Sequence, residues 1–170
     1  MSSPVPVVGL LMGSDSDWPV VQQTAQTLDA FGVAYEVRVI SAHRTPDLAH
    51  DYACGAAARG LQVLIAAAGG AAHLAGALAA NTNLPVIGVP LATGTLGGFD
   101  ALLATVQMPA GVPVATVAIG QPGATNAALL AVQILALSRP DVAARLAAHK
   151  THLRDKAAQA DARVQTESRK

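Results

Sequence analysis

The chain has 170 residues, only 13% of them are charged, and its formal net charge is zero. This length is typical of one domain with a sizeable core, and the neutral balance with 3% aromatic residues argues against a nucleic-acid-binding protein. The single cysteine, Cys54, excludes a disulfide framework and the paired cysteines of a zinc site.

Two explanations fit the low share of charged residues. One is a bias toward alanine, and the other, which we favour, is that other subunits cover much of the surface. The first basic residue is Arg38, so the apolar start of the chain lacks the positive region of a secretory signal, and we expect a soluble, cytoplasmic protein. Residues 63–80 are long enough to imitate a membrane span, but their glycines and His73 favour a strand, a turn and a helix.

Apolar, β-branched runs alternate with helical patterns in the first half of the chain. Three runs predict buried strands at residues 5–12, 35–40 and 63–68. Each run precedes a segment with helical spacing, and the predicted helices cover residues 18–31, 45–59 and 72–81. Small polar residues or glycines stand at the junctions, where helix caps and tight turns are expected.

The second half continues this alternation with shorter elements. Strands are predicted at residues 85–89 and 114–119, with a short helix at 99–106 between them. Residues 126–137 are helical and apolar almost all round, which predicts a buried helix, with a neighbouring subunit as one candidate cover. The charged helix after Pro140 is expected to be an exposed or subunit-bridging arm.

Five strand-and-helix alternations without a linker or repeat predict the α/β class. We expect a three-layer sandwich with a parallel sheet, flavodoxin/Rossmann-like, in a single domain with a C-terminal helical arm. Residues 1–138 would form the α/β unit, and residues 139–170 a helical extension of the same domain. Because the carboxyl ends of parallel strands share one edge, the loops after the first three strands should meet in one crevice.

The loop after the first strand, residues 12–18, combines a glycine with small hydroxyl and acidic side chains. Backbone N–H groups at a helix start bind anions, so Ser14 and Ser16 are candidates to bind a phosphate. Asp17 would repel a phosphate and is a candidate to hold ribose hydroxyls. Simple helix capping explains the same residues, and the loop lacks the glycine patterns of dinucleotide and Walker sites.

Ser41, His43 and Arg44 directly follow the second strand. Arginine offers a planar fork for phosphate or carboxylate, and histidine changes its charge near neutral pH. A lone histidine is more often structural. Beside Arg44 and at the end of a strand, however, His43 is the strongest candidate for proton transfer.

The third loop contains Ala68, Gly69 and Gly70, followed by His73. Two consecutive glycines let the backbone approach a ligand and offer N–H groups to a carboxylate, although a tight turn without a ligand would also use them. His73 is expected one turn into the next helix, as a hydrogen-bond partner in the site or as a core histidine.

Five motifs in order carry a resemblance to a known family. They are Met-Gly-Ser-x-Ser-Asp-Trp at 12–18, Ser-Ala-His-Arg-Thr-Pro at 41–46, Gly-Gly-Ala-Ala-His-Leu at 69–74, Val-Gln-Met-Pro-Ala-Gly-Val-Pro-Val at 106–114 and Asn-Ala-Ala-Leu-Leu-Ala-x-Gln-Ile-Leu at 126–135. Together they resemble the class I N5-carboxyaminoimidazole ribonucleotide mutases of purine biosynthesis, over about residues 5 to 140.

The resemblance implies a cytoplasmic homo-octamer that uses neither a metal nor an organic cofactor, with a small ribonucleotide as its partner and no nucleic acid or membrane. It implies an isomerase whose catalytic domain, residues 1–138, moves a carboxyl group from the exocyclic nitrogen of the substrate to C4 of its ring. The roles implied are general acid/base for His43, phosphate binding for Ser14 and Arg44, ribose binding for Asp17, carboxylate contact for Ala68, Gly69 and Gly70, and further substrate contacts for Ser16, Ser41 and His73.

The chain departs from the family pattern in three places. Ala67 stands for a glycine, Ala75 stands for a proline, and residues 92–95 differ, which bears on loop geometry and rate more than on the reaction. Two alternatives remain open: the related carboxylase, which fixes free CO2 onto aminoimidazole ribonucleotide, and a non-catalytic ribonucleotide-binding relative. The Val-Gln-Met-Pro segment favours the mutase.

Overall fold

The computed structural model describes residues 5–168 and is built on a five-stranded sheet in which all neighbouring strands run parallel. The strands are β1 (Val8–Met12), β2 (Tyr35–Val39), β3 (Val63–Gly69), β4 (Val86–Leu91) and β5 (Ala115–Thr116). Their order, β2-β1-β3-β4-β5, is that of a flavodoxin-like fold and confirms the predicted parallel α/β sandwich.

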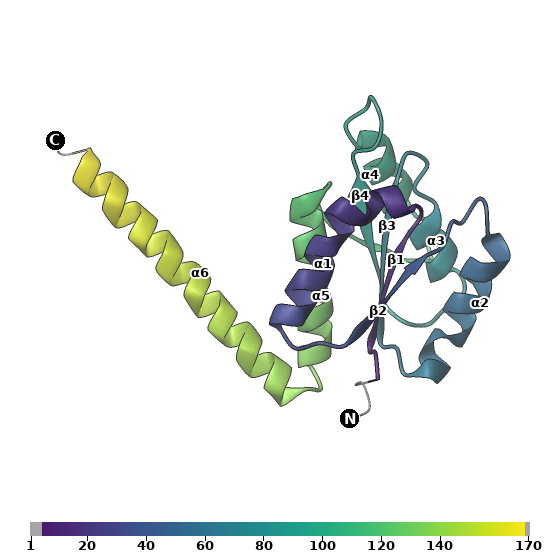
Figure 1. The fold of residues 1–170 in the computed structure, drawn as a ribbon, viewed down its shortest axis with the longest axis horizontal. Coiled ribbons are helices and arrows are strands. Elements are labelled where there is room, and N and C mark those ends of the chain that lie inside the picture. Colours follow the sequence, from purple (N-terminus) through teal and green to yellow (C-terminus); the bar gives the residue numbers. More distant parts are fainter. Residues whose placement is uncertain (1–4, 169–170) are drawn as a thin grey trace.

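Helices cover both faces of the sheet (Figure 1). One face carries α1 (Trp18–Ala30) and α5 (Gln121–Ala136), and the other carries α2 (Pro46–Ala56), α3 (Leu74–Ala79) and α4 (Phe99–Val106). Short 3-10 turns precede α1 and follow α2, at Asp15–Asp17 and Ala57–Arg59.

The central strands are buried on both faces, which explains their uninterrupted apolar sequences. Alternate side chains enter two separate clusters because successive residues of a strand point in opposite directions. Leu10 and Ile65 pack toward α1 and α5, whereas Leu11 and Leu64 pack toward α2 and α3. The sheet is therefore fixed from both sides, and its carboxyl edge is a rigid platform for the loops.

Several element boundaries differ from the predicted ones. Strand β1 begins at Val8 instead of residue 5, and β5 has two residues instead of six. Helix α5 begins at Gln121, five residues before the predicted start, because proline suits the first turn of a helix. One side of α5 is buried against α1 and the sheet, so the expected burial is present within the chain itself, while Leu137 just beyond it is 89% exposed.

Residues 63–80 form β3, a turn and α3, as the sequence predicts. Within residues 5–168, no helix is at once long and apolar enough to span a bilayer.

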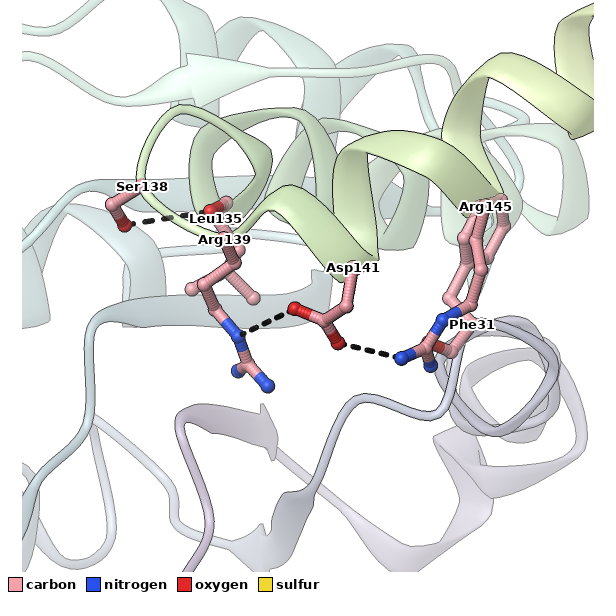
Figure 2. Close-up of polar contacts among 6 residues, drawn as sticks. All are labelled: Phe31, Leu135, Ser138, Arg139, Asp141 and Arg145. Carbon is pink, nitrogen blue, oxygen red and sulfur yellow. Dashed lines mark hydrogen bonds and ion pairs between the residues drawn. The ribbon is translucent and has the colours of Figure 1, made fainter.

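Helix α6 (Pro140–Glu167) has 28 residues and projects from the body of the molecule (Figure 1). Its first turns are attached to the end of α1, because Arg145 donates to the carbonyl oxygen of Phe31, the C-cap residue of α1. Within α6, Arg145 also donates to the Asp141 carboxylate at 2.6 Å (Figure 2). The ring of His149 also meets Phe31 edge-on, with centroids 5.3 Å apart. Beyond this attachment the helix is exposed, which matches the expectation of an arm.

The contact between α1 and α5 contains a buried hydrogen bond that can be tested. The hydroxyl of Thr24, which is 1% exposed, donates to the carbonyl oxygen of Ala124 at 2.9 Å. Thr24→Val keeps the shape and removes the donor, so it should lower the free energy of unfolding by about 1 kcal/mol in urea titrations at fixed protein concentration. The matched control is Thr125→Val, whose lost hydrogen bond to Gln121 lies at the surface, and it should change stability by less than about 0.5 kcal/mol. Equal effects of the two changes would contradict this assignment.

Candidate active site

A cavity of about 370 Å³ opens at the carboxyl edge of the sheet, where the loops after β1, β2, β3 and β4 meet. All the predicted site residues line it except Gly70. The lining residues are Gly13, Ser14, Ser16, Asp17, Ser41, Ala42, His43, Arg44, Ala68, Gly69, Ala72, His73, Leu74 and Thr93.

Ser14 caps the short turn that leads into α1. Its Oγ accepts hydrogen bonds from the Ser16 N–H at 3.3 Å and from the Ser16 hydroxyl at 2.8 Å, while the Asp17 carboxylate accepts from the Ser14 N–H at 3.2 Å. This reciprocal capping box fixes the turn. These residues therefore cap the helix start and can also bind a ligand, because the capping box holds the hydroxyls of Ser14 and Ser16 at the cavity.

Asp17, at the end of this loop, carries a buried carboxyl group that lines the cavity; the residue is 7% exposed. Burial raises the pKa of Asp17 above its usual value, while the Ser14 N–H and the positive charge of Arg44 act in the opposite direction. An acceptor with so little access to water is suited to accept hydrogen bonds from a bound ligand.

Arg44 connects the loop after β2 to the loop after β1. Its Nη2 donates to the carbonyl oxygen of Gly13 at 2.7 Å, and its Nε and backbone N–H donate to the Ser41 hydroxyl at 3.3 and 3.2 Å. Within residues 5–168, its Nη1 has no hydrogen-bond acceptor, so the guanidinium is held in place with donors left for a ligand.

His43 and His73 form a close pair across the cavity. His43 Nε2 lies 2.7 Å from His73 Nδ1, and the rings are nearly perpendicular at 82°. Two lone pairs would repel at this distance, so one of the two nitrogens carries a hydrogen. The pair brings together a side chain after β2 and a side chain after β3, which are 30 residues apart in the chain.

The turn between β3 and α3 differs from the prediction. Gly70 and Ala72 both have positive φ angles, 59° and 42°, so the backbone cannot be helical there and α3 starts only at Leu74. His73 is therefore the N-cap of α3 and does not lie one turn inside it, which corrects the sequence-based placement. Gly70 shapes the turn through its φ angle instead of lining the cavity.

Sequence reasoning missed several cavity residues, of which Thr93 is the most informative. Gly13 and Ala42 flank predicted residues, and Ala72 and Leu74 lie beside His73. Thr93 follows β4, and the rule that placed the first three loops at one edge would also have placed this fourth loop there.

Two of the departures from the family pattern are in the core. Ala67 and Ala75 are buried, and neither lines the cavity. Ala67 packs in the cluster with α1 and α5, and Ala75 packs in the cluster with α2 and α3. These two departures are therefore outside the cavity lining, whereas the third, at residues 92–95, reaches the cavity through Thr93.

The site combines a serine loop at a helix start and the guanidinium of Arg44, which suit an anion, with a histidine pair that can hold and release a proton. Within residues 5–168, no group of three or more His, Cys, Asp or Glu side chains is placed to hold a metal ion.

Comparisons with known proteins agree with this fold and its motifs. A family model described as AIR carboxylase matches residues 7–156. A Mycobacterium tuberculosis protein named N5-carboxyaminoimidazole ribonucleotide mutase is 58% identical over 160 residues, covering 94% of this chain and 91% of that protein. A Pseudomonas aeruginosa protein of the same name is 60% identical over 134 residues, covering 79% of this chain and 82% of that protein.

The crystal structure of Treponema denticola PurE superposes with a TM-score of 0.84 at 28% identity, covering 93% of this chain and 98% of that one. By sequence and by fold, the chain belongs to the AIR carboxylase family.

Proposed function

We propose that this enzyme isomerises N5-carboxyaminoimidazole ribonucleotide to 4-carboxyaminoimidazole ribonucleotide in purine biosynthesis, with His43 as the general acid and base. The relatives that match this chain at 53–60% identity bear the name of that mutase. The observation that carries the proposal is the contact between His43 and His73 in the same cavity as Arg44 and the capped serine loop.

We propose one orientation for the ribonucleotide in the cavity. Its phosphate lies against the Ser14 and Ser16 hydroxyls and the free donors of Arg44, at the start of α1. The ribose hydroxyls donate to the buried carboxylate of Asp17. This orientation directs the base toward the histidine pair and the backbone at Ala68 and Gly69, which are supplied by the next loop along the sheet.

The reaction moves one carboxyl group and returns His43 to its starting state. Protonated His43 donates its proton to the carbamate nitrogen as the N–C bond breaks, which releases CO2 inside the cavity. Ring carbon C4 attacks the CO2 and forms the new C–C bond. Neutral His43 then removes the proton from C4 and is protonated again, so the same residue gives and takes up one proton in each turnover.

His73 assists by holding the His43 ring. Its Nδ1 lies 2.7 Å from His43 Nε2, which limits rotation of the ring while a proton arrives and leaves. Ser41 acts in the same way on Arg44, because its hydroxyl accepts hydrogen bonds from the Nε–H and the backbone N–H of Arg44. We propose that both are positioning residues that also line the substrate cavity.

A substrate-choice assay tests the proposed reaction. The enzyme is given N5-carboxyaminoimidazole ribonucleotide in one series and aminoimidazole ribonucleotide with bicarbonate in another. We expect efficient turnover of the first substrate. Efficient turnover of the second alone would identify a carboxylase, and binding without turnover of either would identify a non-catalytic relative.

Asp17→Asn should separate substrate binding from stability. The amide oxygen can still accept from the Ser14 N–H, and the change removes a buried charge that burial disfavours, so thermal stability at pH 7 should be unchanged or slightly higher. The sign follows because the raised pKa of Asp17 means that ionisation opposes folding above that pKa. KM should rise about tenfold, because a charged acceptor forms stronger hydrogen bonds to the ribose than a neutral one. A lower melting temperature with normal KM would contradict the ribose assignment.

We also propose a cytoplasmic homo-oligomer, an octamer by resemblance, in which residues 139–170 extend the catalytic domain 1–138. The support is a set of exposed apolar side chains on and beside α4, which would be in contact with water if the protein were a monomer. They are Leu96 (66% exposed), Phe99 (61%), Leu103 (45%) and Val106 (49%). The exposed free thiol of Cys54 suits a reducing compartment. Light scattering that gives the mass of a single chain would contradict the oligomer.

A further inference from the structure

A side chain from the fourth loop enters the cavity on the side away from the serine loop. Thr93 follows β4, and β4 pairs with β3 up to Leu91, which lies beside Gly69. Since β3 separates β1 from β4, the loop that carries Thr93 lies two strand spacings, about 10 Å, from the loop that carries Ser14. Thr93 thus lies at the opposite end of the cavity from the proposed phosphate position.

Thr93 is packed directly onto the backbone of Gly69. A Cβ atom at Gly69 would overlap the Thr93 hydroxyl oxygen and would lie 2.6 Å from its Cγ2 and 2.8 Å from its Cβ. The missing side chain of Gly69 therefore makes the space that Thr93 occupies. This close approach restricts the Thr93 side chain to the end of β3, where the proposed carboxylate position lies.

The Thr93 hydroxyl differs from the hydroxyls of Ser14, Ser16 and Ser41, each of which has a hydrogen-bond partner within the protein. The Ser14 and Ser16 hydroxyls donate to Asp15 and Ser14, and the Ser41 hydroxyl accepts from Arg44. Among residues 5–168, none provides a hydrogen-bond partner for the hydroxyl of Thr93, although its side chain lines the cavity. Its donor is therefore available to a ligand.

We propose that the Thr93 hydroxyl donates a hydrogen bond to the migrating carboxyl group, and that its methyl group packs against the CO2 after the N–C bond breaks. This inference rests on the proposed isomerisation. Carbon dioxide is uncharged and its oxygens are weak acceptors, so neither Arg44 nor a serine cluster at the far end can retain it. A hydroxyl and a methyl on one restricted side chain suit both the anionic carboxylate and the neutral CO2.

The test measures two products from one substrate. N5-carboxyaminoimidazole ribonucleotide is supplied to each variant, and the 4-carboxy product and the decarboxylated aminoimidazole ribonucleotide are quantified in the same samples. Thr93→Val has the same shape without the donor, Thr93→Ser retains the donor, and Thr95→Val is a control in the same loop at a residue outside the cavity lining.

Thr93→Val should lower kcat about tenfold or more, leave KM within about threefold, and raise the fraction of substrate lost as CO2. Thr93→Ser retains the hydroxyl but lacks the methyl group, so it should keep kcat within about threefold of wild type and lose more substrate as CO2 than wild type but less than Thr93→Val. Thr95→Val should match wild type. A wild-type product ratio in Thr93→Val, or equal impairment of the Val and Ser variants, would overturn the proposal. Absence of isomerisation in the wild type would overturn the proposed function itself and this inference with it. Thermal unfolding of each variant verifies that it is folded.

Discussion

Replacing His43 with asparagine is expected to lower kcat by about 10² to 10⁴-fold, the range that positioned acid–base groups contribute. Asparagine can still form a hydrogen bond to His73 but can neither donate a proton to the carbamate nitrogen nor remove one from C4. Both proton transfers fail together, because one residue is assigned to both. Rates are measured with saturating substrate, so that any change in binding does not enter kcat.

Substrate binding should survive the change at His43. The phosphate and ribose contacts are assigned to Ser14, Asp17 and Arg44, so the dissociation constant from calorimetry should stay within a few fold. The control is His152→Asn, an exposed residue on α6, which should behave as wild type. Unchanged kcat in His43→Asn would refute the acid–base assignment, and lost affinity with normal kcat would reassign His43 to binding.

Replacing Arg44 with alanine should raise KM about 10 to 100-fold with a smaller change in kcat. The change removes a charge-assisted hydrogen bond to the phosphate, which contributes about 1.5–3 kcal/mol. It also removes the ties to Gly13 and Ser41 that hold the two loops together. Arg44→Lys should recover only part of the affinity, because a lysine retains the charge but not the planar fork.

A double comparison isolates the phosphate contact of Arg44. Affinities of wild type and Arg44→Ala are measured for aminoimidazole ribonucleotide and for the riboside that lacks the phosphate. Removing the phosphate should weaken binding to the wild type strongly and binding to the variant little, because the two changes remove the same interaction. Arg154→Ala, on the exposed part of α6, is the charge control. Additive losses would place the phosphate elsewhere.

The parts of the fold that the sequence predicted correctly are those set by local patterns. Continuous apolar runs marked the central strands, and proline and small polar residues marked the starts of α1 and α2. The start of α5 was misplaced because the prediction followed the apolar pattern from residue 126, whereas the helix begins five residues earlier with a proline in its first turn. Ala124, in that added turn, is buried in the cluster formed with α1 and the sheet. The end of β5 was misplaced because pairing with β4 involves only Ala115 and Thr116.

By itself, the sequence determined the parallel α/β class and the gathering of the loops that carry Ser14, His43, Arg44 and Gly70 at one edge, because the alternation of strands and helices dictates where loops emerge. Only the tertiary structure decided how these side chains meet. The positive φ angles at Gly70 and Ala72 delay α3 and turn His73 toward His43, and the pairing of β3 with β4 carries Thr93 onto Gly69. Those contacts join segments about 24 to 30 residues apart, and distances between such segments are set by strand order and packing and not by any local pattern.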